Sequence, residues 1–493
     1  MTIYDNCTKI LLQYTFVCEL NTQITMFGGI SMKKSVKRWT GIILSAAILI
    51  TAMVLPALGG LSTESVRALG ILIVTMIFLV TEPVPVGITA PLLIVLLSLM
   101  NVVTLQAALS NSMTTLFLFL MACYGISSVL LKSSLPYRLA YFLLKKARGK
   151  SIWIIGAFML CTAVISSLVS NVPCALIITG ICSSVLAAMG EKPGESRLGR
   201  SLLLAVPFGA VFGGMMTPAG SSLNILSMQL VAQATGKDIL FIEWMMVGIP
   251  LALVMIAISI PVLKLLFRPE DISPENMEMA LAEVSHDKKL TSYDIKAIII
   301  LSATFILWIL TSWIPWINVT VVSVFALVTF FLPGLDMLTW KEYSRECGWD
   351  TILICSAILS VGAALVSTGL TDWVVLRVSS VFVGTGLFIF IVLIAAIVNW
   401  THLLIPTASA IVVLYAVAFA GLAVSLGIDP RIVTFSVAAM SSCVLLIPFD
   451  PVVIVAYTTR YFKIKDLFTA GVIVSTIWTL LLGLWLPIVF SII

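Results

Sequence analysis

The chain has 493 residues, of which 60% are hydrophobic and 10% are charged, and its mean hydropathy is +1.15. Soluble domains hold about 25% charged residues, so this composition, with its repeated apolar runs of about 20 residues, predicts an all-α polytopic membrane protein in contact with the lipid bilayer. The net charge of +5 predicts no nucleic-acid partner. The nine cysteines form no CxxC pair and there are only two histidines, so we expect no resident cofactor. The sequence has no P-loop, and we therefore expect no ATP-driven pump on this chain.

Residues 1–39 are predicted to form an N-terminal cytoplasmic segment. Residues 1–31 match neither a signal peptide nor a membrane span, whereas "MKKSVKRW" (residues 32–39) has the basic cluster that precedes the first span of a bacterial inner-membrane protein. The sequence leaves open whether Met1 or Met32 starts the protein.

The apolar runs predict two halves joined by a hydrophilic cytoplasmic linker at residues 268–292. The first half, residues 40–267, has spans near 40–58, 67–81, 84–103, 112–131 and 242–267, and a Pro- and Gly-interrupted region at 151–240. The second half, residues 293–493, has spans near 294–313, 317–333, 351–368 and 467–490, and an interrupted region at 385–459. Basic residues at 33–38, 132–150 and 460–465 place the N-terminus in the cytoplasm and the C-terminus outside.

The two halves contain similar stretches of sequence in the same order. "TLFLFLMACYGISSVLLKSSLPYRLA" (residues 115–140) parallels "TILICSAILSVGAALVSTGLTDWVVL" (residues 351–376), and an interrupted region follows each stretch. We therefore expect two inverted-topology repeats, each with a re-entrant hairpin and a broken transmembrane helix, giving about 11 spans plus two hairpins. The first hairpin would enter from the cytoplasm and the second from outside.

Four polar breaks interrupt the apolar regions. They contain, in chain order, Ser166, Ser170, Asn171 and Pro173; Thr217, Gly220, Ser221, Ser222 and Asn224; Thr401, His402, Thr407 and Ser409; and Asp450 with Pro451. Free N–H groups at a broken helix can hold an anion, and carbonyl, hydroxyl and amide oxygens suit a hard cation such as sodium. The alternative is that these residues only allow close packing and kinks, which would explain one break more readily than four at matching places.

These motifs resemble the divalent anion:sodium symporter family over roughly residues 40–490. "SSLVSNVPCAL" is similar to the first hairpin tip of that family, "GMMTPAGSSLN" to its first helix break and "YFKIKDLFTAG" to the segment after its second break. The resemblance implies a homodimer with an elevator-type motion. It also implies a first sodium near Ser166, Ser170, Asn171 and Gly220, with Asn171 and Ser221 facing a substrate carboxylate.

At corresponding places in the second half, Thr407 and Pro451 are candidates for substrate contacts, and Thr401 and Asp450 for the coupling cation. Further candidates for the site are Thr217, Ser222, Asn224, His402 and Ser409.

The chain departs from the family pattern mainly in its second half. Val172 stands where the first tip has Thr, Ile405-Pro406-Thr407 replaces Ser-Asn-Thr, and Asp450 begins a second break that has no Asn. We expect Asp450 to bind the coupling cation or to take a proton in its stead, and the alternative is a helix cap. His402 could titrate near neutral pH or simply lie at an interface.

Taken together, the sequence predicts a secondary active transporter of a small anion, such as a di- or tricarboxylate or sulfate, coupled to sodium, protons or anion exchange. One alternative is a divergent transporter of a monovalent or neutral solute. A channel and an intramembrane enzyme are remote alternatives. For an enzyme, Asp450 would need a second deep acid, and His402 would need a nucleophile beside it.

Overall fold

The computed structural model describes residues 34–492 except 56, 58–59, 286–289, 315 and 406. Most of the predicted N-terminal segment therefore lies outside the described residues. Within the described residues the regular structure is entirely helical, which confirms the all-α class. The first helices are α2 (Lys34–Val54), α3 (Thr63–Thr81), α4 (Val86–Leu99), α5 (Leu105–Ser112), α6 (Thr115–Lys132) and α7 (Leu135–Ala147).

The interrupted region of the first half forms a helix pair and then a broken helix. Its elements are α8 (Ser151–Ser166), α9 (Asn171–Ala188), α10 (Arg197–Met216), the short 3-10 helix η2 (Pro218–Gly220) and α11 (Ser222–Thr235). A long helix, α12 (Phe241–Phe267), follows. The helix pair is a helical hairpin because only residues 167–170 separate α8 from α9, which pack against each other.

The second half repeats this order. After α14 (Ser292–Leu310), α15 (Val319–Thr329), α16 (Trp340–Glu346), α17 (Trp349–Ser367) and α18 (Leu370–Phe382) come a hairpin, a broken helix and a long helix. They are α19 (Leu387–Thr401), α20 (Ala408–Ser425), α21 (Arg431–Ser442), α22 (Pro451–Tyr457) and α23 (Ile464–Phe490).

Ten helical segments among the described residues are long and apolar enough to cross a membrane. Four shorter apolar helices accompany them, α4, α8, α15 and α19, and two of these are the first arms of the hairpins. The chain is therefore a multi-pass membrane protein, as its composition predicts.

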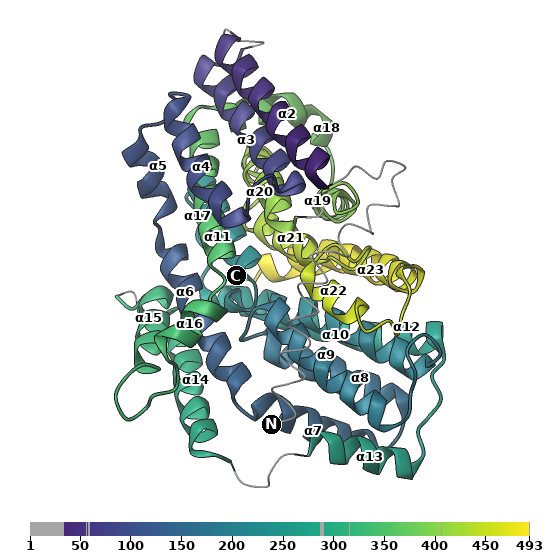
Figure 1. Cartoon of the computed structure of the whole chain (residues 1–493). Helices are drawn as coiled ribbons and strands as arrows, with labels where there is room; N and C mark the ends of the chain where they lie inside the picture. The colour runs from purple at the N-terminus through teal and green to yellow at the C-terminus, as the bar shows by residue number, and fades with distance from the viewer. Residues whose placement is uncertain are drawn as a thin grey trace.

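The hairpins and broken helices of the two halves pack into one body. Figure 1 shows α8, α9, α10 and α12 side by side, with α22 and α23 against them, while α2, α3 and α18 lie at the opposite end. The second arm of each hairpin packs on the segment beyond the break in the other half, α9 on α22 and α20 on α11. We call α8–α12 together with α19–α23 the hairpin unit, and α2–α6 together with α14–α17 the outer helices.

Part of the predicted linker is an ordered helix, α13 (Pro274–Val284), which packs against α7 and α9. The backbone N–H of Ile272 donates to the carbonyl of Gly149 at 2.9 Å. The side chain of Asp271 accepts hydrogen bonds from the backbone N–H and the hydroxyl of Ser151, both at 2.8 Å. These bonds hold the linker against the end of the first hairpin where α8 begins.

Candidate transport site

The first hairpin turns at its polar residues, as the sequence predicts. Helix α8 ends at Ser166, and α9 begins at Asn171 with Pro173 in its first turn, where a proline removes no intrahelical hydrogen bond. Ser170 is the N-cap of α9 and is half-buried, but its side chain makes no capping hydrogen bond. The tip therefore presents the N-terminus of α9 together with two buried polar side chains, Ser166 and Asn171.

The broken helix of the first half opens between Met216 and Ser222. Thr217 is extended, with φ −133° and ψ 157°, so the helix cannot continue through it. Its hydroxyl donates to the carbonyl of Ser167 in the hairpin turn at 2.5 Å and accepts the N–H of Gly220 at 3.1 Å. The amide of Asn224 donates to the carbonyls of Gly214 at 2.7 Å and Thr217 at 2.9 Å. The break is therefore bonded to the hairpin tip.

Four oxygen-bearing residues meet between the hairpin tip and the break. The hydroxyl of Ser166 donates to the carbonyl of Ala210 at 2.8 Å. With its amide nitrogen turned inward, Asn171 donates to the carbonyls of Gly220 and Ala210, each at 3.1 Å, and to the Ser166 hydroxyl at 2.8 Å. If the amide oxygen of Asn171 is turned inward instead, all the atoms that these four residues direct at one another are oxygens, which are the ligands that a hard cation requires.

Two glycines make room for this cluster. A Cβ atom at Gly220 would lie 2.6 Å from the carbonyl oxygen of Gly214 and 2.9 Å from that of Ser166. A Cβ atom at Gly214 would lie 2.2 Å from Asn171 Oδ1. Because carbonyl oxygens of the backbone cannot move aside as a flexible side chain can, position 220 requires glycine, whereas a side chain at position 214 would displace Asn171 from the cluster.

The residues after the break expose a helix N-terminus beside the cluster. Ser221 is buried and caps α11, its hydroxyl accepting the N–H of Leu223 at 3.3 Å, while Ser222 is half-buried in the first turn. The free N–H groups and the positive end of the helix dipole favour an anion here. This position suits a substrate carboxylate or sulfate.

The tip of the second hairpin differs from the first. Thr401 hydrogen-bonds the hydroxyl of Tyr415 at 2.8 Å and the carbonyl of Ile397 at 2.7 Å. Thr407 donates to the carbonyl of Leu79 in α3 at 3.1 Å, so its hydroxyl faces an outer helix. Ser409 is half-buried in the first turn of α20, and residue 406 lies outside the described residues.

At the second break Asp450 caps a helix. Its carboxylate accepts the N–H of Val452 at 2.9 Å, and Pro451 occupies the first turn of α22 with an exposed side chain. The helix cap that the sequence offered as an alternative is thus present. The cap uses only one of the two carboxylate oxygens, so the other is available to a ligand and the capping role and the cation role are compatible.

His402 and Asp450 line a common cavity, a juxtaposition that the sequence analysis missed. The cavity has a volume of about 10 Å³, roughly the room for one water molecule, and its other walls are Val444, Leu446, Ile447 and Phe449. His402 is buried, and its Nε2 hydrogen-bonds the carbonyl of Met440 at 3.1 Å, so Nε2 carries the hydrogen. Both residues are ionisable and lie in the polar breaks of the second half, and this shared feature of the sequence is the available signal.

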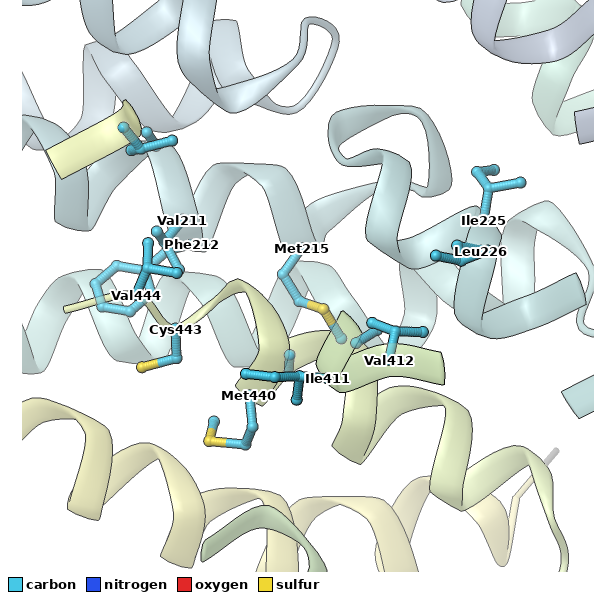
Figure 2. Close-up of a cluster of buried hydrophobic side chains, with 14 of the residues drawn as sticks. Val211, Phe212, Met215, Ile225, Leu226, Ile411, Val412, Met440, Cys443 and Val444 are labelled. Carbon is cyan, nitrogen blue, oxygen red and sulfur yellow. The ribbon is translucent and has the colours of Figure 1, made fainter. Parts of the chain in front are cut away.

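Between the two breaks the contact is apolar. Figure 2 shows side chains of α10, α11, α20 and α21 together with the segment after α21, all converging on one buried cluster. The labelled members are Val211, Phe212, Met215, Ile225, Leu226, Ile411, Val412, Met440, Cys443 and Val444. The polar groups of the first break are therefore separated from those of the second break by packed hydrocarbon.

The structure thus brings together part of the set that the sequence predicts. Ser166, Asn171 and Gly220 form one cluster, with Thr217 and Asn224 supporting it. Thr407 does not join this cluster in the described part of the chain, since its hydroxyl donates to the Leu79 carbonyl of α3. The ligand roles of all these residues stay predictions.

Comparisons with known proteins agree with this architecture. The profile of the family described as the sodium:sulfate symporter transmembrane region matches residues 36–492. A sodium-dependent dicarboxylate transporter, SdcS, of Staphylococcus aureus is 22% identical over 482 residues, covering 92% of each chain. The protein of the same name in Staphylococcus saprophyticus is 22% identical over 466 residues, covering 89% of this chain and 88% of the relative.

A solved structure supports the fold alone. The YdaH transporter of Alcanivorax borkumensis, described as having an unusual topology, superposes with a TM-score of 0.52 at 12% identity, over 77% of this chain and 86% of that one. The family match extends over nearly the whole chain, and the matched proteins are transporters, not enzymes. The chain belongs to the sodium:sulfate symporter family of membrane transporters, the divalent anion:sodium symporter family that its motifs resemble.

Proposed function

We propose that this protein is a sodium-coupled transporter of a small divalent anion, a di- or tricarboxylate or a sulfate-like ion. The observation that carries the proposal is the cluster of Ser166, Asn171, Ala210 and Gly220, which combines hydroxyl, amide and carbonyl oxygens between a hairpin tip and a helix break. The dicarboxylate relatives named above support the same substrate class.

Sodium binding would turn the Asn171 amide so that its oxygen enters the cluster. In that orientation its nitrogen leaves the carbonyls of Ala210 and Gly220 and becomes available as a donor to an anion beside Ser221. One side chain would then contact both the cation and the substrate, so each ligand would favour binding of the other. This shared contact is a physical basis for symport.

In the second half, we propose that Asp450 replaces the lost amide as the charged group of a second coupling site. Its carboxylate faces the cavity shared with His402, and a carboxylate at membrane depth is costly unless a cation or proton accompanies it. Anion exchange without a cation is the competing mode of coupling, and a monovalent or neutral solute is the competing substrate, because Val172 lacks the hydroxyl that the family pattern places at the first tip.

Transport would proceed by an elevator-type motion of the hairpin unit against the outer helices. The contact between Thr407 and the Leu79 carbonyl lies between these two parts, so it would break as the hairpin unit moves.

We also propose a homodimer in a bacterial inner membrane. The loops and helix ends around Gly149, Glu191 and Tyr461 gather at one end of the hairpin unit, together with many Lys and Arg, and this end would face the cytoplasm.

The test is uptake by purified protein in proteoliposomes. Radiolabelled succinate, citrate, sulfate and lactate are compared under an inward sodium gradient, an inward proton gradient and anion-loaded exchange conditions. We expect a divalent anion to accumulate under the sodium gradient, and the Asn171→Ala variant to lose this uptake while Asn276→Ala, on α13, retains it. Uptake of lactate alone, or of a neutral solute alone, would contradict the proposal.

A further inference from the structure

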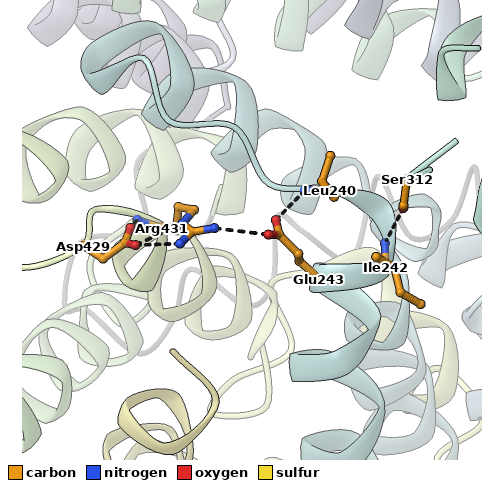
Figure 3. A network of polar contacts seen from close by, with 6 residues as sticks. All are labelled: Leu240, Ile242, Glu243, Ser312, Asp429 and Arg431. Atoms are coloured by element: carbon orange, nitrogen blue, oxygen red, sulfur yellow. Dashed lines mark hydrogen bonds and ion pairs between the residues drawn. The ribbon is translucent and has the colours of Figure 1, made fainter. Parts of the chain in front are cut away.

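Two arginines occupy corresponding places in the broken helices. Arg200 lies in the first turn of α10, and Arg431 is the first residue of α21. Arg431 pairs with Glu243 at 3.2 Å and with Asp429 at 2.8 Å (Figure 3). Arg200 Nε lies 3.4 Å from the carboxylate of Asp466. All four paired side chains, Arg200, Asp466, Arg431 and Glu243, are between 18% and 26% exposed, so water screens them only in part.

The acids that meet these arginines also correspond. Glu243 and Asp466 are each the third residue of a helix of 27 residues, α12 and α23. Each carboxylate accepts the backbone N–H three residues earlier, Leu240 at 2.8 Å and Lys463 at 2.9 Å. The two ion pairs made by these acids cross between halves, because Glu243 of the first half binds Arg431 of the second and Asp466 of the second binds Arg200 of the first.

Each arginine also contacts the far end of the long helix in its own half. The guanidinium of Arg200 lies 5.8 Å from the ring centre of Phe267, the last residue of α12. That of Arg431 lies 5.3 Å from the ring centre of Phe490, the last residue of α23. The long helices α12 and α23 therefore run antiparallel, and one arginine sits at each end, between the first turn of one helix and the last residue of the other.

The same long helices touch the two breaks. A Cβ atom at Gly248, the eighth residue of α12, would lie 2.3 Å from the carbonyl oxygen of Met215 beside the first break. A Cβ atom at Gly471, the eighth residue of α23, would lie 2.0 Å from the carbonyl oxygen of Leu445 in the second break. Five residues of helix, about 7.5 Å, separate each glycine from the acid on the same helix.

We infer that Arg200 with Asp466, and Arg431 with Glu243, are positioning residues that couple the two breaks of the transporter. Helix α12 pairs through Glu243 with the broken helix of the second half, and its Gly248 packs against the first break. Helix α23 pairs through Asp466 with the broken helix of the first half, and its Gly471 packs against the second break. A shift at the first break when sodium binds would therefore move α12, and through Arg431 would move α21 and the second break. The inference rests on the proposed sodium site in the first half.

Hydrogen–deuterium exchange of the full-length protein, with no transported anion present, tests this coupling. Exchange is followed by mass spectrometry in residues 217–224 and 443–450, with sodium and with choline in its place. We expect sodium to slow exchange at both breaks in the unaltered protein. In Glu243→Gln and Asp466→Asn, sodium should still protect the first break, whereas its effect at the second should fall by about two- to fivefold, the scale of a partly exposed ion pair.

These substitutions remove charge and keep an acceptor for the helix cap, so the helices retain their start. Lys132→Gln is the matched control, because it removes another ion pair, with Glu342 at 3.0 Å, that lies outside the hairpin unit. Arg431→Lys keeps the charge and should retain part of the sodium effect.

The outcomes separate the inference from the proposed function. Protection of the first break alone in the unaltered protein would overturn the coupling and leave the sodium site standing. Protection of neither break would overturn both. Undiminished protection of the second break in both Glu243→Gln and Asp466→Asn would also overturn the coupling, whereas its loss in them but not in Lys132→Gln would support it.

Discussion

At the scale of single residues, the first break is closely packed, so its residues tolerate little change in side-chain size or position. Gly220 allows the carbonyls of Gly214 and Ser166 to approach the position of its missing Cβ within 3 Å. The side chains of Ser166 and Asn171 are held by several bonds at once, which limits the geometry of any bound cation. The second break has fewer such restraints, since Thr401 and Thr407 direct their hydroxyls elsewhere.

Replacing Gly220 by Ala should damage the cation cluster. The added methyl group would push apart backbone atoms of α8 and α10, so we expect a loss of about 1–3 kcal/mol of stability and a rise of at least about tenfold in the sodium concentration needed for thermal stabilisation. The measurement is a thermal-shift titration with sodium. Gly386→Ala is the control, because a Cβ atom there would meet nothing within 4 Å. Equal sodium responses of the two variants would contradict the assignment of the cluster.

Replacing Asp450 by Asn should separate its two roles. Asparagine can still accept the Val452 N–H, so the cap of α22 and the expression level should be retained. The negative charge is lost, so we expect coupling to the ion gradient to be abolished, measured as gradient-driven accumulation of anion in proteoliposomes. Asp372→Asn, an exposed carboxylate on α18, serves as control. Unchanged accumulation in Asp450→Asn would remove this residue from the coupling mechanism.

At the scale of elements, hydrogen bonds fix both ends of α8, the first arm of the first hairpin. The start of α8 is fixed to the linker by Asp271, and the turn after α8 is fixed to the first break by Thr217. Helix α13 buries Met277, Ala280 and Val284 against this end of the hairpin. The linker therefore belongs mechanically to the hairpin unit.

The bond between Asp271 and α8 should make this end of the hairpin sensitive to acid. Hydrogen bonds from the backbone N–H and then the hydroxyl of Ser151 lower the pKa of Asp271 below its ordinary value of 3.8. A depressed pKa means that the stabilisation is present above pH 3.8 and is lost as the pH falls through the folded-state value. Because the side chain is 61% exposed, the effect is modest.

We therefore expect hydrogen exchange at the start of α8 to rise as the pH falls below about 4, beyond the intrinsic pH effect on exchange, in the unaltered protein. In Asp271→Asn it should already be raised at pH 6 and should change little further. Glu278→Gln, which alters an exposed acid on α13, should behave as the unaltered protein does. A pH profile of Asp271→Asn that matches the unaltered protein would show that this bond does not hold the linker.

At the scale of the whole molecule, the sequence was sufficient for the class and for the positions of the interruptions. Polar residues in otherwise apolar stretches located the turn near Asn171 and the break near Gly220 to within a few residues, because hydrocarbon leaves irregular backbone few other places. The start of α13 is also visible in the sequence, since Ser273-Pro274-Glu275 is a typical helix start.

Contacts between distant segments could not be predicted in this way. Asp466 lies 266 residues from Arg200 in the sequence, and the polar run that contains Thr407 does not reveal that its hydroxyl faces α3. The cavity shared by His402 and Asp450 likewise depends on the path that the chain takes after α21 ends at Ser442. Periodicity and composition report which residues are buried but not which of them meet.

The central claim is that sodium binds between the first hairpin tip and the first break. Equilibrium binding of ²²Na⁺ to the purified protein tests it most directly, with Ser166→Ala and Asn171→Ala compared against Asn276→Ala. We expect saturable binding that Asn276→Ala retains and that each of the first two variants weakens by at least about tenfold, since each removes one oxygen of the cluster. Saturable binding that survives both substitutions unchanged would contradict the claim.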